Sequence, residues 1–345
     1  MMATSDGFGS SGEHSIEFAF GHKRPKGQRL RLGNAGAKAQ AWRTVRKVPE
    51  VMVRVSGGGK TLQHVKAHFD YISRNGKLDM INDQGERIGG KDQVADLFDS
   101  WDLDLSKGHG TNKQAFNVVF SMPAGTDPEK VLAATQAFAR ETLYGKHQYA
   151  MVLHTQETDP HKDAPAHPHV HLIIKAEGHD GKRLHIRKAT LQQWREIFAE
   201  QLRDRGIEAN ATPRAVRGIT PKAKTIDIYH LEKQGESKVR AAKLLEAQTD
   251  LNNPPTELKP WEKAILNRRS KTLREMHSVA DQYEKEGDKA LAGAIRSYVA
   301  DLPPLETERH LLRKEVAEKV AALRDRERER PTDKQRDTGD KDLDR

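Results

Sequence analysis

The sequence predicts an α+β fold, in which a central antiparallel sheet is flanked by helices and followed by an all-helical C-terminal module. Three observations predict it. Short runs of alternating, β-branched residues occupy the middle of the chain and are separated by helical patterns. An Asp-Gly pair at 180–181 is typical of the hairpins that join antiparallel strands. After about residue 220, long charged segments are interrupted by prolines.

The predicted strands and helices alternate along the chain. EVMVRVS has the period of a strand, and TLQHVKAHFDYISR behind it has the spacing of an amphipathic helix. An Asp-Pro pair is expected to start the next helix, because Asp caps and Pro fits the first turn. In order, the elements are a strand at 50–56, a helix from Leu62, a strand at 116–123, a helix from Asp127, strands at 149–155 and 167–178, and a helix that Gly206 ends.

The composition divides the 345-residue chain into four segments. Residues 1–48 are polar, Gly-rich and basic, which predicts a flexible arm. Residues 49–219 contain the predicted sheet. Residues 220–329 form the predicted helical module, and 330–345 are expected to be a disordered tail.

The charge balance and the absence of cysteine limit the possible functions. Lys and Arg number 59 against 50 for Asp and Glu, a formal charge of +9, which favours an anionic partner such as nucleic acid. The chain has no cysteine, so disulfides, thiolate metal sites and cysteine nucleophiles are excluded. No apolar run is long enough to span a bilayer, and we expect a cytoplasmic protein without membrane insertion.

The stretch HPHVHLIIK places two histidines at alternate positions of a predicted strand. His169 and His171 therefore point to the same side of the sheet. If the strands at 149–155 and 169–175 pair as antiparallel neighbours, His154 lies beside them and completes a metal site of three imidazoles. The loop between the strands offers alternative ligands, namely His167 and the pair formed by His161 and Asp163.

A tyrosine on the first predicted helix points away from its apolar stripe. At 100° per residue, Tyr71 lies opposite Leu62, and His64 and His68 share its face. A phenol is a suitable nucleophile for reversible attack on a phosphodiester, because phenolate is also a tolerable leaving group. Only about 0.1% of a phenol is ionised at neutral pH, so this chemistry needs a base or a metal-polarised phosphate.

Three stretches together resemble the conjugative relaxases of the MobA and T-DNA border endonuclease type, within the HUH endonuclease superfamily: HFDYISRNGKLDM, VLHT with HPHVHLIIKAEG, and GKRLHIRKATLQQWREIFAEQLRDRGIEANATPRAVRG. The resemblance covers residues 50–218. It implies strand-specific nicking at an origin of transfer, a covalent 5′-phosphotyrosine link and later rejoining, for conjugative DNA mobilisation. It assigns the nucleophile to Tyr71 and the ligands of a divalent ion, Mg²⁺ or Mn²⁺, to His154, His169 and His171.

The chain departs from the family pattern at Gln156, where a metal-supporting Asp is common. The remaining candidates for a supporting carboxylate or a base are Glu157, Asp159, Asp163 and His68. Candidate DNA-binding residues near the strand ends are Lys175, Lys182, Arg183, Arg187 and Lys188. The partners implied by the resemblance are single-stranded origin DNA, accessory nicking proteins and a type IV secretion coupling protein in a bacterial cytoplasm.

Other functions share some of these features. Rolling-circle replication initiators carry the same histidine pair but place their tyrosine helix after it, and the helix at 190–205 contains no tyrosine, which favours a relaxase. A metal hydrolase with three histidines would use water and would not need Tyr71. A non-catalytic DNA-binding protein would need neither the metal nor a covalent link.

Overall fold

The computed structural model of the protein describes residues 34–103, 112–158, 166–219, 226–255 and 257–328. The chain divides into two compact units. One covers the chain as far as Pro213 together with Val279–Ile295, and the other contains Arg214–Ser278 and the chain from Arg296 onwards.

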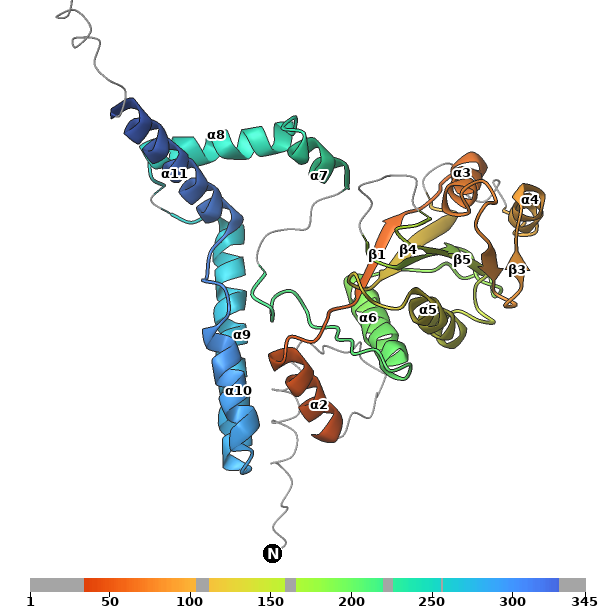
Figure 1. The fold of residues 1–345 in the computed structure, drawn as a ribbon, viewed down its shortest axis with the longest axis horizontal. Coiled ribbons are helices and arrows are strands. Elements are labelled where there is room, and N and C mark those ends of the chain that lie inside the picture. The colour runs from red at the N-terminus through yellow and green to blue at the C-terminus, as the bar shows by residue number, and fades with distance from the viewer. Residues whose placement is uncertain (1–33, 104–111, 159–165, 220–225, 256, 329–345) are drawn as a thin grey trace, which may run out of the picture. The chain divides into compact units, whose positions relative to one another are not determined.

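The first unit is built on one six-stranded sheet in which every neighbouring pair is antiparallel (Figure 1). The strand order is β1-β4-β6-β5-β2-β3. The predicted α+β class with an antiparallel sheet is therefore confirmed. The strands are β1 (Met52–Gly57), β2 (Met80–Asn82), β3 (Arg87–Ile88), β4 (Ala115–Ser121), β5 (Tyr149–His154) and β6 (His169–Lys175).

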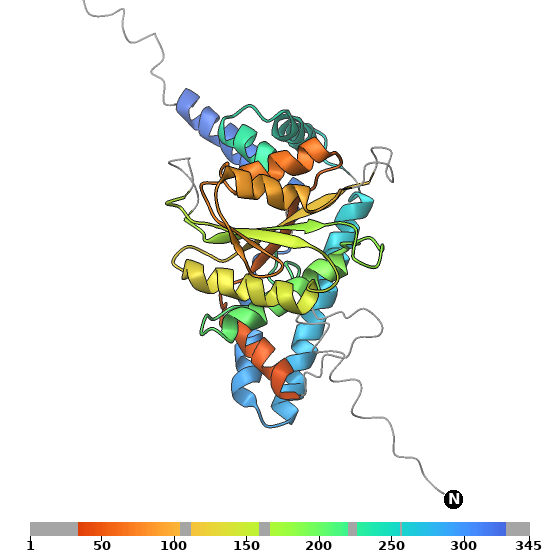
Figure 2. The same cartoon turned by 90° about the vertical axis from the view of Figure 1, so that its right-hand side faces the viewer.

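Helices cover both faces of the sheet, and the alternation of residues along the strands supplies a separate core to each face. Helices α5 (Pro128–Thr142) and α6 (Lys188–Arg203) pack on one face, where the Phe120 ring lies 4.6 Å from the ring of Phe138. Helices α3 (Leu62–Ile72) and α4 (Lys91–Asp99) pack on the other face, where the ring centroids of Phe69 and Trp101 are 4.8 Å apart. Figure 2 shows the sheet between these two helical layers.

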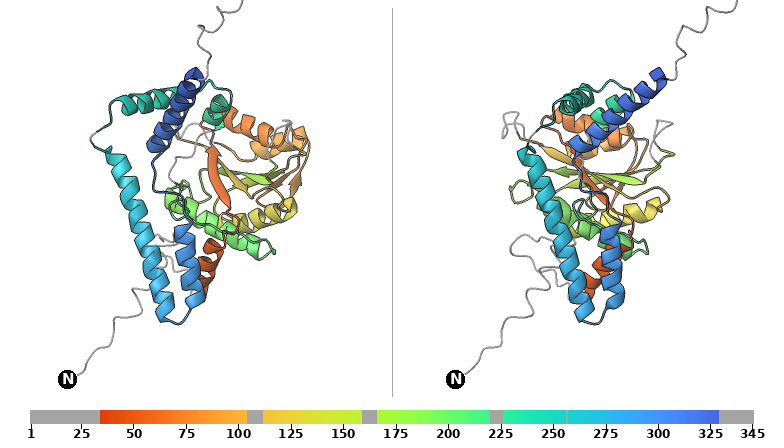
Figure 3. Two further views of the ribbon diagram at one scale, coloured as in Figure 1. Left: turned by 60° about the vertical axis from the view of Figure 1, so that its left-hand side comes forward. Right: turned by 90° about the vertical axis from the view of Figure 1, so that its left-hand side faces the viewer.

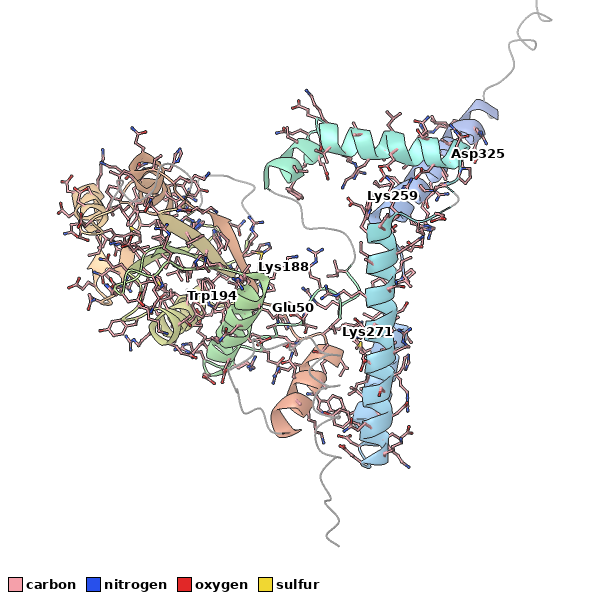
Figure 4. The ribbon with its side chains drawn as sticks, turned by 180° about the vertical axis from the view of Figure 1, so that it is seen from behind. Glu50, Lys188, Trp194, Lys259, Lys271 and Asp325 are labelled. Atoms are coloured by element: carbon pink, nitrogen blue, oxygen red, sulfur yellow. The ribbon has the colours of Figure 1, made fainter. Side chains whose placement is uncertain are left out.

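Of the two helices on the α5 face, α5 begins where the sequence predicts, and α6 begins two residues before the predicted start at 190. The Asp127 side chain accepts a hydrogen bond from the Glu129 backbone nitrogen at 3.0 Å and so caps α5. Helix α6 begins at Lys188, and its Trp194 is buried on the side that faces the sheet (Figure 4).

The short hairpin of β2 and β3, together with α4, was not predicted from the sequence. Gly76 leads into this segment with a φ of +80°, and a Cβ there would lie 2.4 Å from the backbone of Gly90 and Lys91. Only glycine fits this close crossing, which fixes the return of the chain to α4.

The segment predicted as a flexible arm contains a helix, α2 (Asn34–Val45). Its alanine-rich sequence favours a helix, and its buried Gln40 and Thr44 side chains hydrogen-bond to the buried Asn210. A flexible arm is thus the wrong description for these residues, while residues 1–33 lie outside the described part of the chain.

The predicted Asp-Gly turn forms, but it leads into a single bridge and not into a strand. The Gly178 nitrogen donates to the Lys182 carbonyl at 2.8 Å, and Gly181 has a φ of +74°. Glu177 then pairs with Arg183 as an isolated bridge. Pairing stops there because the chain soon enters α6.

The C-terminal part is helical, as the sequence predicts. Its first two helices are separate, because Gly235 adopts a φ of +79° and Ser237 caps the helix that follows. Helix α10 follows α9 after a short turn (Figure 3). Among the described residues no helix is both long and apolar enough to cross a bilayer. The helices are α7 (Ile226–Lys233), α8 (Lys238–Asn252), α9 (Pro260–Lys285), α10 (Lys289–Ala300) and α11 (Glu308–Arg328).

Candidate active site

Three histidines converge on the α3 face of the sheet. Because β5 and β6 pair antiparallel, His154 lies directly opposite His169, and Val152 opposite His171. The ring centroids are 4.6 to 5.3 Å apart, and one nitrogen from each ring lies within 4.8 Å of the others. The strand pairing expected from the sequence therefore brings these side chains together at a spacing that suits a shared ion.

Backbone carbonyls fix the protonation of two of these rings. The Nε2 atom of His154 lies 2.6 Å from the Ile72 carbonyl oxygen, and Nδ1 of His169 lies 3.0 Å from that of His167. A carbonyl only accepts, so each of these nitrogens carries a proton, and in the neutral ring the other nitrogen carries the lone pair. Ligand histidines in metal sites are commonly oriented in this way.

The third ring, that of His171, is buried and neutral. Burial is the main cause that lowers the pKa of His171 to about 2, and the nearby His154 and His169 add to it. A neutral imidazole is the form that binds metals. Its Nδ1 lies 3.2 Å from the side-chain amide nitrogen of Asn117, a residue of β4 that the sequence analysis did not single out.

Helix α3 presents Tyr71 to the histidine cluster. The side chain is 55% exposed, as the helical period predicts, and its ring centroid lies 6.2 Å from that of His171. The hydrogen bond from His154 ends on Ile72, the residue after Tyr71, so the cluster is tied directly to this part of the helix. The residues that anchor α3 on the sheet are fully buried: Val65, Phe69 and Ile72.

Two further groups lie around the tyrosine ring. His68 is one turn earlier on α3, with its ring centroid 6.3 Å from that of Tyr71. Burial lowers the pKa of His68, and the neighbouring Asn117 amide opposes this effect. Arg74 follows the helix with a φ of +53°, and its guanidinium carbon lies 5.1 Å from the Tyr71 ring centroid. The sequence analysis did not identify Arg74.

Of the predicted supporting carboxylates, Glu157 is the one that the structure describes, and it does not belong to the histidine cluster. Glu157 is exposed in the turn after β5. Asp159 and Asp163 lie outside the described residues, as does His161. His167 is exposed and contributes its backbone carbonyl to His169.

The predicted DNA-binding residues follow one another from the last residue of β6 to the start of α6. Lys175 is six residues along β6 from His169, about 20 Å at the rise of a strand. Its ammonium donates to the Gln148 side chain at 3.1 Å, and Arg183 donates to the Lys113 carbonyl. Lys182 pairs with Asp180 on the surface, whereas Arg187 and Lys188 are exposed at the start of α6 (Figure 4).

The edge strand β1 adds a cation that the sequence analysis missed. Arg54 is exposed and pairs with Val119, which in turn pairs with His171. These three residues form one row across the same face of the sheet, so the Cα atoms of Arg54 and His171 are about 10 Å apart at the usual strand spacing.

Comparison with known protein families finds one that resembles the segment containing this site. Residues 71–207 match the relaxase model described as the MobA/VirD2-like nuclease domain. This segment of the chain is therefore similar to the nuclease domain of MobA/VirD2-type relaxases. The match begins at Tyr71 and includes all three histidines, which agrees with the resemblance found in the sequence.

The curated proteins that the chain resembles include T-DNA border endonucleases. The VirD2 protein of Rhizobium radiobacter is 28% identical over 227 residues, which cover 60% of this chain and 51% of the relative. VirD2 of Agrobacterium fabrum is 27% identical over 214 residues, covering 55% of this chain and 46% of the relative. The chain thus spans about half the length of the curated relatives it matches.

Proposed function

We propose that the protein nicks one strand of DNA by a metal-assisted tyrosine transesterification. The phenolic oxygen of Tyr71 attacks the scissile phosphorus, the bond from phosphorus to the 3′ oxygen breaks, and a 5′-phosphotyrosine forms. The phenol proton passes to a base, and the leaving 3′ oxygen takes up a proton. The reverse reaction rejoins the strand. The placement of an exposed Tyr71 ring 6.2 Å from the His171 ring carries this proposal.

The three histidines supply a donor set that fits a divalent cation. Neutral imidazoles favour a transition-metal ion, and of the two predicted ions Mn²⁺ suits nitrogen ligands better than Mg²⁺, which prefers oxygen. When bound, such an ion stabilises negative charge on a phosphate oxygen. The protein contributes three imidazole nitrogens, which two paired strands place close together on one rigid face of the sheet.

The residues beside Tyr71 have the chemistry that the proton transfer needs. His68 lies on the same side of α3, and burial favours its neutral form, which can accept the phenol proton. The Arg74 guanidinium faces the Tyr71 ring, where it can stabilise a phenolate and an incoming phosphate.

A single strand of DNA is the substrate we assign. Arg54 offers a phosphate contact in the same row as His171, and Arg187 with Lys188 offers another at the start of α6. Action at an origin of transfer during conjugation, and the accessory and coupling proteins that this implies, are proposed from the family resemblance.

The test uses a labelled pool of random single-stranded oligonucleotides and the tag-free full chain with Mn²⁺. We expect a DNA adduct that survives denaturing electrophoresis, disappears with EDTA and is absent in Tyr71→Phe. Tyr144→Phe is the matched control, because Tyr144 is 53% exposed just after α5 and outside the site. Sequencing of the captured DNA would then define the preferred site.

Two results would overturn the proposal. Normal adduct formation by Tyr71→Phe would exclude this tyrosine as the nucleophile. Metal-dependent hydrolysis of small phosphodiesters that Tyr71→Phe leaves intact, without any adduct in the wild type, would instead support a hydrolase with three histidines.

A further inference from the structure

We propose that Asn117 is a positioning residue of the metal site. In this role the amide is turned so that its oxygen, and not its nitrogen, faces His171. The oxygen accepts a hydrogen bond from the Nδ1–H group, which leaves the Nε2 lone pair of that ring for the cation. The inference rests on the metal site proposed above.

Asn117 lies on the strand next to the histidines and faces the same side of the sheet. It is 2% exposed, and it pairs with Ile173, two residues from His171 on β6. One terminal atom of its amide, the nitrogen, lies 3.2 Å from His171 Nδ1 and 2.5 Å from the Ser56 hydroxyl. The other terminal atom, the oxygen, is buried and makes no hydrogen bond of normal geometry, although the amide also neighbours His68 and raises its pKa.

The orientation of this amide decides the protonation of His171. With the nitrogen toward the ring, Nδ1 has to accept, so the proton sits on Nε2 and blocks it as a ligand. A half turn of the amide places the oxygen there, and both the His171 Nδ1–H group and the Ser56 hydroxyl then donate to it. This second orientation no longer leaves a buried oxygen without a donor, and such an oxygen is costly.

The neighbouring edge strand is shaped to support the amide. The register between β1 and β4 shifts between Val55 and Gly57, so Ser56 is the extra residue of a bulge, and its hydroxyl contacts the Asn117 amide. Bulges commonly redirect a side chain in this way. An amide therefore takes the role that a carboxylate often has behind a ligand histidine.

The decisive measurement is the tautomer of His171 in the metal-free full chain, read from long-range proton–nitrogen NMR spectra and assigned with His171→Gln. We expect the Nδ1–H form in the wild type and in Asn117→Asp, whose carboxylate also accepts. We expect Asn117→Ala to lose this preference and to bind Mn²⁺ about 10- to 100-fold more weakly in calorimetry. Asn82→Ala, which removes another buried amide, hydrogen-bonded to Glu86, should change neither property.

An Nε2–H tautomer in the wild type, or unchanged Mn²⁺ affinity in Asn117→Ala, would overturn the role of Asn117. The tautomer of the wild type decides the matter even if Asn117→Ala fails to fold. If the wild type binds no Mn²⁺, the proposed metal site fails, and the tautomer measurement still reports on Asn117 separately.

Discussion

Binding of Mn²⁺ should stabilise the folded sheet, and the His171→Ala substitution should remove most of this stabilisation. The three ligand nitrogens come within 4.8 Å of one another only when β5 and β6 are paired, because the histidines belong to two different strands. The unfolded chain therefore lacks the site, and the free energy of binding adds to the free energy of unfolding.

The size of the effect follows from the ion concentration. At 100 times the dissociation constant, a ligand that binds only the folded state stabilises it by about 2.7 kcal/mol. A domain of 150 to 250 residues gains about 2–4 °C in melting temperature for each kcal/mol, so the wild type should shift by about 5–11 °C. His171→Ala also opens a cavity, since the ring is 8% exposed. The quantity to compare is therefore the Mn²⁺-dependent shift within each variant.

The assay is thermal unfolding of tag-free protein, first stripped with EDTA and then titrated with MnCl₂. His179→Ala is the control, because His179 is exposed in the turn after β6 and outside the cluster. It should shift as the wild type does. Equal shifts in His171→Ala and the wild type, or no shift in the wild type, would refute the assignment of the three histidines.

Three other substitutions test separate parts of the molecule. Arg54→Ala should weaken binding of single-stranded DNA and reduce the slope of log K against log salt by about 0.7, measured by fluorescence anisotropy; an unchanged slope would exclude a phosphate contact. Arg74→Gln should slow adduct formation by about 100-fold in single-turnover kinetics while leaving the melting temperature unchanged, and a wild-type rate would rule out its role. Arg309→Leu should destabilise the second unit by about 3–5 kcal/mol in urea unfolding, because it leaves the buried Asp250 and Glu262 carboxylates without their shared cation; a loss below 1 kcal/mol would contradict this.

The long strands were predictable and the short ones were not. β1, β4, β5 and β6 each have six or seven residues, which is enough for alternation or a continuous apolar run to show. β2 has three residues and β3 has two, so neither displays a period. Their existence depends on pairing with β5, a contact between distant parts of the chain that local patterns do not encode.

Some residues of the candidate site could likewise be predicted from the sequence, and others could not. His154, His169 and His171 were found because their spacing along two strands carries the signal. Asn117 and Arg54 were missed, because their place near the cluster depends on the register of neighbouring strands. The backbone carbonyls that orient two of the imidazoles could not be predicted from side-chain motifs, because every residue has such a carbonyl. The functional roles of all these residues stay predictions until the variants are measured.

The hydrogen bond from His154 to the peptide carbonyl beside Tyr71 physically joins the histidine cluster to the helix that carries the tyrosine. If binding of a DNA strand against α3 favours the helix position that this hydrogen bond needs, DNA will raise the affinity of the site for the cation. The cation must then raise the affinity for DNA by the same factor, because coupling between two binding sites is reciprocal. A protein linked in this way would bind an uncut strand most tightly when the ion is present, and it would release that strand more readily in a cell depleted of the ion.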